Sequence, residues 1–423
     1  MRTDGGDEAL RAFVDNAERW TTDDIGFEEN APSNNAGPDH KDDWAIHDAV
    51  DLDQGSIEPR AWLLGVSVCR RYVTVLAAGG GTGKTTLALA WALSLATGRS
   101  LIGEFVHRRA RVLLITAEDG KDEVRRRLRA AQMHYKLDAI DRGWLHLLVL
   151  TGSGSTLATL GPNGQIMETE TPQRIEAAVR HLGIDTVILD PFIKLGGAPE
   201  NDNLAVDFVM RLLVRLADSC NVAVLLLHHV RKGQAEAGNA EMARGAKSLI
   251  DAARIALTLT PMTVDEAKAM GISEDERRRL VRLDDGKANL APLCSQARWH
   301  RLASVNLGNG NADYPNGDNV QAIETWEPPD TWASLSSDLL NRVLDDIDAG
   351  TPDGERYSDA SAAKERAAWQ VVQRHASEKT PAQCRQVIKA WRKSGLPFVK
   401  EYTSSARREK ANGLFVDQSR RPS

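Results

Sequence analysis

A glycine-rich stretch that ends in Lys84 and Thr85 is the part of the chain best suited to chemistry. Small residues let several backbone N–H groups point at one place, and the N-terminus of a following helix adds partial positive charge there. The lysine can reach the outer phosphates of a nucleotide, and the threonine hydroxyl can contact a bound magnesium ion. We therefore predict a phosphate-binding loop, the alternative being a turn that binds nothing. The residues expected to bind the cofactor are Gly79, Gly80, Gly81, Thr82, Gly83, Lys84, Thr85 and Thr86.

The elements that must position this loop can be recognised on either side of it. An apolar run over residues 72–77 predicts a buried strand, and residues 86–96 predict a helix that ends at Gly98. Position 78 holds alanine where such loops usually begin with glycine. Because the methyl group of alanine is small, we expect the turn to keep its shape.

Two further apolar runs end in carboxylates. Residues 186–189 precede Asp190, which we expect to hold magnesium through water, with a helix cap as the alternative. Residues 112–116 lead to Glu118 and Asp119. A glutamate at this place can orient or deprotonate the water that attacks ATP, so we assign Glu118 to that task. The alternative is that both acids begin the next helix, where they would favour its dipole, and this suits Asp119.

A third apolar run, residues 222–227, ends in two histidines. We expect His229 to hydrogen-bond the γ-phosphate and sense its loss. For His228 we expect the more common role of a buried histidine that packs in the core.

Strand and helix patterns alternate from about residue 60 to residue 308. This predicts an α/β fold with a mostly parallel sheet and helices on both faces. A Pro-Asn-Gly turn at 162–164 predicts a small hairpin. The expected strands are 73–77, 112–116, 145–150, 186–189, 222–227, 255–259, 280–283 and 301–305. The expected domains are a disordered acidic tail over 1–45, an ATPase domain over 46–308, a linker over 309–330 and a small unit over 331–418.

Charge is spread unevenly over the 423 residues, whose formal net charge is −6. Residues 1–60 contain 16 acidic and 5 basic residues, whereas residues 353–421 contain 15 basic and 8 acidic ones. A basic end suits a contact with nucleic acid or a solvated helical face. The four cysteines lack metal or redox spacing, and no apolar run is long enough to span a membrane. The first residues lack the apolar core of a signal peptide, so we expect none. A cytoplasmic protein is expected.

Taken together, these segments resemble the RecA-like P-loop ATPases. Within that class they are most similar to the RepA-type hexameric replicative helicases of plasmids and phages and to related AAA-type ATPases. The residues that carry the resemblance are Gly79–Thr86, Ile115–Asp119, Val187–Pro191, His228–Gly233 and Ala243–Arg254.

The resemblance implies that ATP sites are shared between subunits of a ring, expected to be a hexamer. Arg254 stands where the family places an arginine finger that reaches the ATP of a neighbouring subunit, with a surface salt bridge as the alternative. Lys287 belongs to a segment that approaches nucleotide across the interface in related helicases. There an arginine often stands where this chain has Asn289, so any such role would fall to Lys287.

The resemblance also implies two loops that line the central channel and grip single-stranded DNA, over residues 191–203 and 230–244. Their glycines and few cations suit a grip on phosphates that ignores sequence. Phe192, the aromatic residue of these loops, is expected to pack rather than to stack on bases.

The unit over 331–418 shows three helical patterns and two short apolar pieces around a basic turn. It could be a winged-helix module or a small helical domain whose bases are solvated or bind a protein. In the first case Arg385, Lys389, Trp391, Arg392 and Lys393 lie on the recognition helix, and Arg407, Arg408 and Lys410 lie on the wing.

The sequence therefore favours an ATP- and Mg²⁺-dependent DNA motor, a ring-forming replicative helicase of plasmid or phage type. The competing hypothesis is a regulatory switch, an initiator or loader in which ATP controls the binding of DNA or a partner without unwinding.

Overall fold

The computed structural model describes residues 57–150, 155–197, 202–230, 247–292, 294, 296–329, 336–360, 363–404 and 408–421. The segment 1–45 and nearly all of the expected DNA loop 230–244 lie outside these residues. The chain divides into two compact units. The first contains the residues up to Thr260, Leu283–Ala297 and Ala303–Glu324, and the second contains Pro261–Arg282, Arg298–Leu302 and the chain from Thr325 onward.

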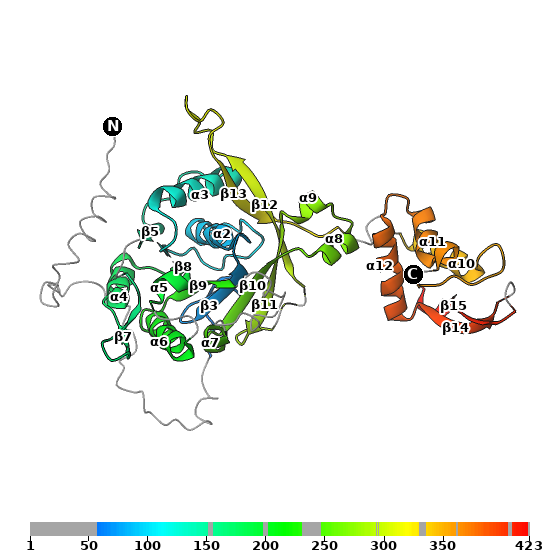
Figure 1. The fold of residues 1–423 in the computed structure, drawn as a ribbon, viewed down its shortest axis with the longest axis horizontal. Coiled ribbons are helices and arrows are strands. Elements are labelled where there is room, and N and C mark those ends of the chain that lie inside the picture. Colours follow the sequence, from blue (N-terminus) through cyan, green and yellow to red (C-terminus); the bar gives the residue numbers. More distant parts are fainter. Residues whose placement is uncertain are drawn as a thin grey trace, which may run out of the picture. The chain divides into compact units, whose positions relative to one another are not determined.

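A nine-stranded sheet carries the glycine-rich loop (Figure 1). In spatial order its strands are β13 (Asn319–Thr325), β12 (Arg298–Asn306), β11 (Leu280–Ala288), β10 (Ile255–Pro261), β3 (Val73–Gly79), β9 (Ala223–Val230), β8 (Thr186–Asp190), β4 (Val112–Thr116) and β5 (Leu145–Val149). The strands from β10 to β5 in this order pair in parallel. The expected α/β fold with a mostly parallel sheet is thus confirmed, as are the eight expected strands.

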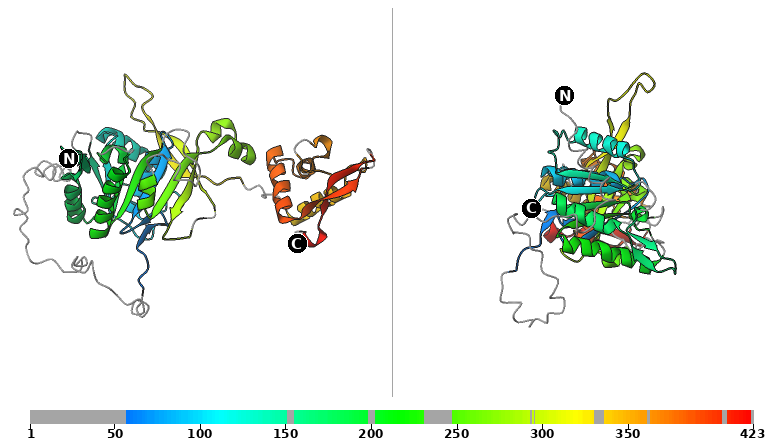
Figure 2. Two further views of the ribbon diagram at one scale, coloured as in Figure 1. Left: turned by 60° about the horizontal axis from the view of Figure 1, so that its bottom comes forward. Right: turned by 90° about the vertical axis from the view of Figure 1, so that its left-hand side faces the viewer.

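Helices cover both faces of this sheet (Figures 1 and 2). On one face lie α2 (Lys84–Thr97) and α3 (Lys121–His134), and on the other lie α4 (Thr171–Leu182), α6 (Asn203–Ser219) and α7 (Lys247–Ala252). Successive side chains of a strand point to opposite faces. Val73, Val75, Val224 and Leu226 therefore share one face and pack with α6 in a buried apolar cluster. Burial on both faces explains why these strands are continuous apolar runs.

Shorter elements complete the part of the chain before the C-terminal helices. β1 (Trp62–Leu64) pairs with β2 (Val68–Cys69), and the expected hairpin is present as β6 (Ala158–Leu160) and β7 (Ile166–Glu168). Helix α5 (Phe192–Leu195) also belongs to the first unit, whereas α8 (Val264–Met270) and α9 (Glu274–Arg277) belong to the second. In the described residues no helix has the length and apolar character needed to cross a membrane.

The segment 309–330 differs from the expected linker, because it contains the edge strand β13. Ala322 and Ile323 are fully buried, and the hydroxyl of Tyr135 on α3 donates to the carbonyl of Ile323. Only these two β13 residues are buried, since an edge strand exposes its other side chains. The segment is rich in Asn, Gly and Pro from the β12–β13 turn, and only two residues of its short strand are buried. Its composition is therefore that of a linker, although it contains a strand.

The C-terminal part of the second unit has its own apolar core. Its elements are α10 (Ser337–Ala349), the 3₁₀ turn η4 (Lys364–Arg366), α11 (Ala368–His375), α12 (Pro381–Ser394), the antiparallel strands β14 (Pro397–Thr403) and β15 (Lys410–Val416), and the 3₁₀ turn η5 (Gln418–Arg420). Val343, Val371, Val387 and Leu414 bring side chains from all three helices and β15 into one buried cluster. This order of three helices and a hairpin is the one expected for a winged-helix-like module. We call residues 336–421 the C-terminal module.

Candidate functional site

The glycine-rich loop joins the end of β3 to the start of α2. Gly81 and Gly83 have φ angles of 78° and 90°, in the left-handed region that favours glycine. The hydroxyl of Thr82 donates to the carbonyl of Gly79 and closes the turn. No side chain caps the N-terminus of α2, so the N–H groups of its first turn are available to an anion. Ala78 is a buried residue of β3 and lies before the turn, so its methyl group leaves the loop unchanged.

The ammonium group of Lys84 is buried within this loop. The residue is 4% exposed, and its Nζ atom has no hydrogen-bond partner among the described residues. Burial lowers the pKa of Lys84 to about 8, although the charges of Asp190 and Glu118 act in the opposite direction. A buried cation that lacks an acceptor is costly in the free protein. It fits a ligand rich in anionic oxygens, such as the phosphates of ATP.

Thr85 and Asp190 meet beside this lysine. The Oγ1 atom of Thr85 donates to Oδ2 of Asp190 at 2.7 Å. Burial raises the pKa of the Asp190 carboxyl group, and the Thr85 hydrogen bond and the Lys84 charge oppose this shift. Asp190 does not cap a helix, because α5 begins after Pro191 without a side-chain cap.

A hydroxyl and one carboxylate are oxygen ligands that suit Mg²⁺. Magnesium usually binds through one or two carboxylates together with substrate phosphates and water, rather than in an all-protein cage. In keeping with this, no group of three or more His, Cys, Asp or Glu side chains that could hold a metal ion occurs in the described parts of the chain. Thr85 and Asp190 are therefore the residues that fit a magnesium ion bound with nucleotide.

The parallel register explains why residues so far apart in sequence converge. Thr116 of β4 pairs with Asp190 of β8, and Ala78 of β3 pairs with His229 of β9. The carboxyl ends of parallel strands share one edge of a sheet, and ligands bind there. Residues that follow β4, β8 and β9 consequently lie around the loop that follows β3.

Glu118 and His229 lie together at this edge. The Nε2 atom of His229 is 3.4 Å from Oε2 of Glu118, whose side chain is 54% exposed. Glu118 is outside α3, since the N-cap of that helix is Gly120. Asp119 is not a cap either, and pairs with Arg127 at 3.1 Å. A carboxylate that water can reach, near the buried lysine, has the placement needed to orient an attacking water.

Strand alternation separates the two histidines. His228 points to the other face of β9, where it is 1% exposed and packs edge-on against the ring of Phe192 with centroids 6.1 Å apart. Burial, together with the nearby Lys84 charge, lowers the pKa of His228 to about 4. The expected core roles of His228 and Phe192 are thus confirmed.

Arg254 lies near the amino-terminal ends of the parallel strands, whereas the phosphate loop of the same chain follows their carboxyl ends. It precedes β10, whose Ile255 pairs with Thr74 near the start of β3, whereas the loop follows the end of β3. Five residues of strand, or roughly 16 Å, separate Thr74 from Gly79. Arg254 is exposed, and its side chain forms no ion pair with a described residue.

The segment around Lys287 lies beside Arg254. The backbone N–H of Asn289 donates to the carbonyl of Arg254 at 3.1 Å. The Nζ atom of Lys287 donates to the carbonyls of Ile250 and Asp251 at 2.9 Å each, at the C-terminal end of α7. The ammonium group of Lys287 is therefore used in hydrogen bonds to its own chain. Of these two cations, Arg254 is the one whose side chain is exposed and could contact another subunit.

The two expected DNA loops leave the sheet at the edge that carries the phosphate loop, after β8 and β9. Lys194 is exposed on α5 in the first loop, whereas residues 198–201 and 231–246 lie outside the described part of the chain.

Gln321 of β13 is a residue that the sequence reasoning missed. The Oγ1 atom of Thr86 donates to Oε1 of Gln321 at 3.3 Å, although 235 residues separate them. Thr86 belongs to the first turn of α2, directly after Thr85. A glutamine in a polar segment has no signature, so only the hairpin of β12 and β13 reveals this contact with the phosphate loop.

Parts of the chain are similar to known proteins. Residues 42–235 match the family model described as an AAA domain. The solved structures that match include a DnaB-like replicative helicase, described with its interactions with primase, at 17% sequence identity and a TM-score of 0.40. The match covers 60% of this chain and 59% of the helicase, so the chain spans less than two thirds of that protein. The AAA match includes the phosphate loop and the strands β3, β4, β5, β8 and β9, and their mostly parallel order is consistent with a RecA-like core.

Proposed function

We propose that this protein hydrolyses ATP with Mg²⁺ and works as a ring-forming DNA motor, a replicative helicase of plasmid or phage type. The observation that carries the ATPase proposal is the convergence of Lys84, Thr85, Asp190 and Glu118 at one sheet edge. The proposal that the motor moves on DNA rests on the sequence resemblance. It also rests on the position of β8 and β9, which end beside the phosphate loop and precede the two expected DNA loops.

Each residue has a distinct task in this proposal. Lys84 and the N–H groups of the loop bind the phosphates, and Thr85 and Asp190 hold magnesium. When bound, magnesium would neutralise charge on the phosphate oxygens. Glu118 orients the water and takes its proton, while His229 keeps Glu118 in place and responds to the γ-phosphate.

The position of Arg254 supports a shared site. This residue precedes β10 at the strand ends remote from the loop of its own chain, so an arginine finger at this position would act on the ATP of another subunit. An arginine supplied in this way neutralises charge in the transition state for phosphoryl transfer and can raise turnover by 10³-fold or more. Closed rings of identical subunits provide such head-to-tail contacts, and we propose a hexamer.

Mixed rings give a sharp test of the shared site. Glu118→Gln and Arg254→Ala subunits should each be nearly inactive alone. When the two variants are mixed in equal amounts, about a quarter of the subunit interfaces combine the intact Glu118 of one variant with the intact Arg254 of the other. ATPase activity should therefore return. No recovery in mixtures that form rings would refute a site shared between subunits. Arg129→Ala, which removes an exposed arginine from α3, is the matched control and should hydrolyse ATP normally.

The motor proposal requires coupling to DNA. Phosphate release should rise with single-stranded DNA, and a forked duplex should separate only with hydrolysable ATP. Lys84→Ala should abolish both activities. Mass measurement with and without ATP, on wild type and Arg254→Ala, reports whether the ring forms and depends on nucleotide.

The switch hypothesis has one observation in its favour, the C-terminal module with its separate core. In this alternative, ATP binding controls assembly and the binding of DNA or a partner, and slow hydrolysis resets it. ATP-dependent duplex binding through residues 336–421, without stimulation of hydrolysis by DNA, would favour the switch. Efficient unwinding would exclude it.

A further inference from the structure

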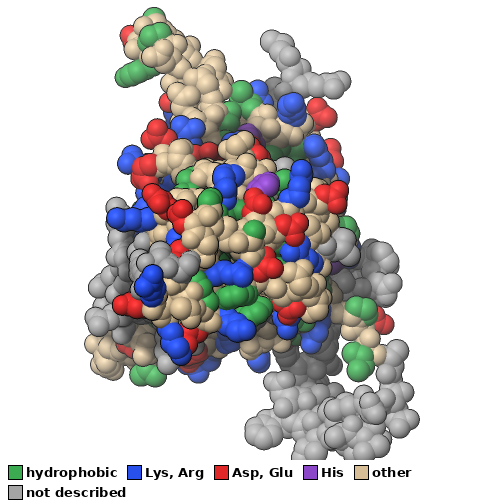
Figure 3. All heavy atoms as spheres, turned by 90° about the vertical axis from the view of Figure 1, so that its right-hand side faces the viewer, with side chains coloured by type: hydrophobic (Ala, Val, Ile, Leu, Met, Phe, Trp, Pro, Cys, Tyr) green, Lys and Arg blue, Asp and Glu red, His purple; other side chains and the backbone are tan. Residues whose placement is uncertain are grey.

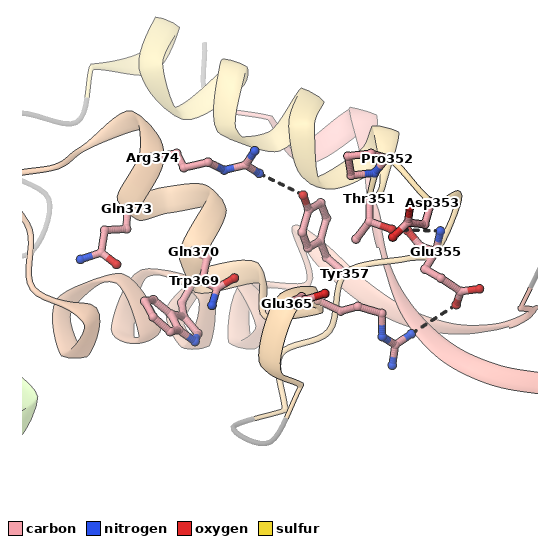
Figure 4. A pocket seen from close by; sticks show the side chains of 11 residues that line it. Thr351, Pro352, Asp353, Glu355, Tyr357, Glu365, Trp369, Gln370, Gln373 and Arg374 are labelled. Atoms are coloured by element: carbon pink, nitrogen blue, oxygen red, sulfur yellow. Dashed lines mark hydrogen bonds and ion pairs between the residues drawn. The ribbon is translucent and has the colours of Figure 1, made fainter. Parts of the chain in front are cut away.

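The C-terminal module has two hollows that are both lined by Trp369. The larger one, of about 760 Å³, is formed by α11 and by residues between α10 and α11 (Figure 4). Its arginines are already paired, since Arg374 donates to the Tyr357 hydroxyl at 2.9 Å and Arg366 lies 3.6 Å from Glu355. Two more acidic side chains line this hollow, so it disfavours a negatively charged ligand.

The smaller hollow, which we call the α12 groove, has the opposite charge. Its volume is about 230 Å³. Sites for small molecules are usually about 300–1,000 Å³, so the α12 groove suits a single side chain of a peptide. Trp369 and Ile388 supply its apolar surface, and three cations outnumber one carboxylate in its lining. The lining residues are Asp359, Trp369, Arg385, Ile388, Lys389 and Arg392.

Several cations at the α12 groove are available to a ligand. Arg385 and Lys389 are exposed, and neither forms an ion pair with a described residue. Lys393, one turn beyond Lys389, is equally exposed and is unpaired among the described residues. Arg392 differs, because it pairs with Asp359 at 2.8 Å. The groove therefore presents positive charge beside its apolar surface.

Helix α12 holds these cations in a fixed alignment. It contains no acidic residue, whereas α10 contains four aspartates and one arginine. The molecular face drawn in Figure 3 mixes acidic and basic side chains, so the charge of α12 stands out only helix by helix. Cys384, Val387 and Trp391 anchor α12 in the core of the module, and a capping box between Thr380 and Gln383 fixes its start.

The chain itself contains a segment of complementary chemistry. Residues 1–56, which precede the described residues and which we call the acidic segment, contain 15 acidic and 4 basic residues. Trp20, Phe27 and Trp44 each have at least two acidic residues within four positions of them. An aromatic ring flanked by carboxylates matches a groove in which apolar surface and unpaired cations lie side by side.

Nucleic acid, the other polyanion that these cations could attract, matches the α12 groove less well. Its phosphates would leave the apolar surface of the hollow unused. Stacking of a base on Trp369 would compete with Arg385, which lies over that ring at 4.6 Å. A peptide can place an aromatic side chain in the hollow and a neighbouring carboxylate on Arg385 at the same time.

We infer that the α12 groove binds the acidic segment of this protein, with an aromatic side chain beside Trp369 and carboxylates on Arg385 and Lys389. The contact occupies the unpaired cations of α12 and withholds them from any other polyanion. It needs neither ATP nor a ring, so it is independent of the proposed motor.

Zero-length cross-linking of the full chain without nucleotide tests this contact. A carbodiimide joins carboxylates to the lysines that they touch, and mass spectrometry identifies the pairs. Lys389 and Lys393 should join to acidic residues of the acidic segment at low salt. The yield should fall in 1 M salt, where the Debye length is only about 3 Å. Absence of these cross-links at low salt would overturn the inference.

Removal of the aromatic rings tests the role of the hollow. Trp20→Ser/Phe27→Ser/Trp44→Ser keeps every charge of the acidic segment, and in the full chain it should lower the yield of these cross-links several-fold. A labelled peptide of residues 15–46 should bind this variant about tenfold more tightly than it binds wild type. The reason is that an attached segment at a local concentration of about 1 mM competes with a peptide whose Kd is about 0.1 mM. Unchanged cross-links or equal peptide affinities would contradict docking in the hollow.

A charge-matched pair in the same full-length variant completes the design. Lys389→Glu should weaken peptide binding about tenfold, whereas Lys400→Glu, an equal charge change on exposed β14 outside the groove, should leave it nearly unchanged. Lys389→Arg keeps the charge and should bind like its parent, which separates charge from folding. Equal losses in the two Glu variants would refute the inference. Protection of Lys389 from acetylation by duplex DNA but not by the peptide would also refute it and assign the groove to nucleic acid.

Discussion

Proton uptake on ATP binding tests the central electrostatic feature of the site, the buried Lys84. In the free protein burial holds the pKa of this lysine at about 8, against an ordinary value of 10.5. Bound phosphates favour the charged form, so the pKa in the complex should return to the ordinary value or rise above it. ATP binding must then take up a proton wherever the free lysine is partly neutral.

The magnitude follows from these two pKa values. At pH 8 the free lysine is half protonated, so binding should take up about 0.5 proton, rising to about 0.9 at pH 9 and vanishing near pH 6.5. ATP affinity should therefore fall about tenfold between pH 7 and pH 9. Above about pH 7.5 the phosphate itself contributes little to this uptake, because its last pKa is about 6.

Titration calorimetry in buffers of different ionisation enthalpy measures this uptake directly. Glu118→Gln should hydrolyse ATP too slowly to disturb the titration, so it is the background in which to measure binding. Lys84→Met in the same background should bind ATP more weakly and take up no proton between pH 7 and pH 9. If the protein with Lys84 showed constant affinity and no uptake over this range, the lysine would not be buried as described and the reasoning would fail.

Three further outcomes are expected. Glu118→Gln should lower ATP turnover at least 100-fold while changing ATP affinity only a few-fold, because the variant loses proton transfer and not phosphate contacts. Phosphate-release and equilibrium-binding assays measure these two quantities. Normal turnover would exclude Glu118 as the base. Gln321→Ala should weaken ATP binding by no more than about tenfold, since it removes one hydrogen bond to Thr86 that is worth about 0.5–1.5 kcal/mol. Lys84→Met should raise the free energy of unfolding at pH 7 by on the order of 3 kcal/mol. The folded pKa of Lys84 is below the unfolded one, so wild-type stability rises with pH from about 8 to 10.5 and the gain should shrink in denaturant titrations at pH 9.5.

Local pattern was sufficient for much of the fold. The strands β3, β4, β8 and β9 are apolar runs because helices cover both faces of the sheet, and each of these runs can be recognised from its own residues. β13 could not be predicted in this way, since only Ala322 and Ile323 are buried and its neighbours are polar turn residues. In the C-terminal module, α11 begins at Ala368 after a 3₁₀ turn over residues 364–366, and the sequence pattern does not distinguish these two kinds of helix.

For the candidate site, the sequence predicted the residue types and the structure decided which of them meet. Glycines at 81 and 83 and the adjacent Lys84 and Thr85 are a local feature, readable without a fold. The hydrogen bond from Thr85 to Asp190 and the contact of Glu118 with His229 exist only because parallel strands align in one register.

By itself, the sequence determined that a phosphate loop lies between a buried strand and a helix, and that carboxylates and histidines follow three other apolar runs. Tertiary structure decided that Lys84 is buried with no acceptor among the described residues, that Gln321 contacts the loop, and that Arg254 is at the strand ends remote from the loop. The physical reason is the separation along the sequence between the residues that interact. Glycine geometry and strand burial depend on residues nearby in the chain, whereas burial of a charge and proximity across the sheet depend on strand pairing between residues a hundred or more positions apart.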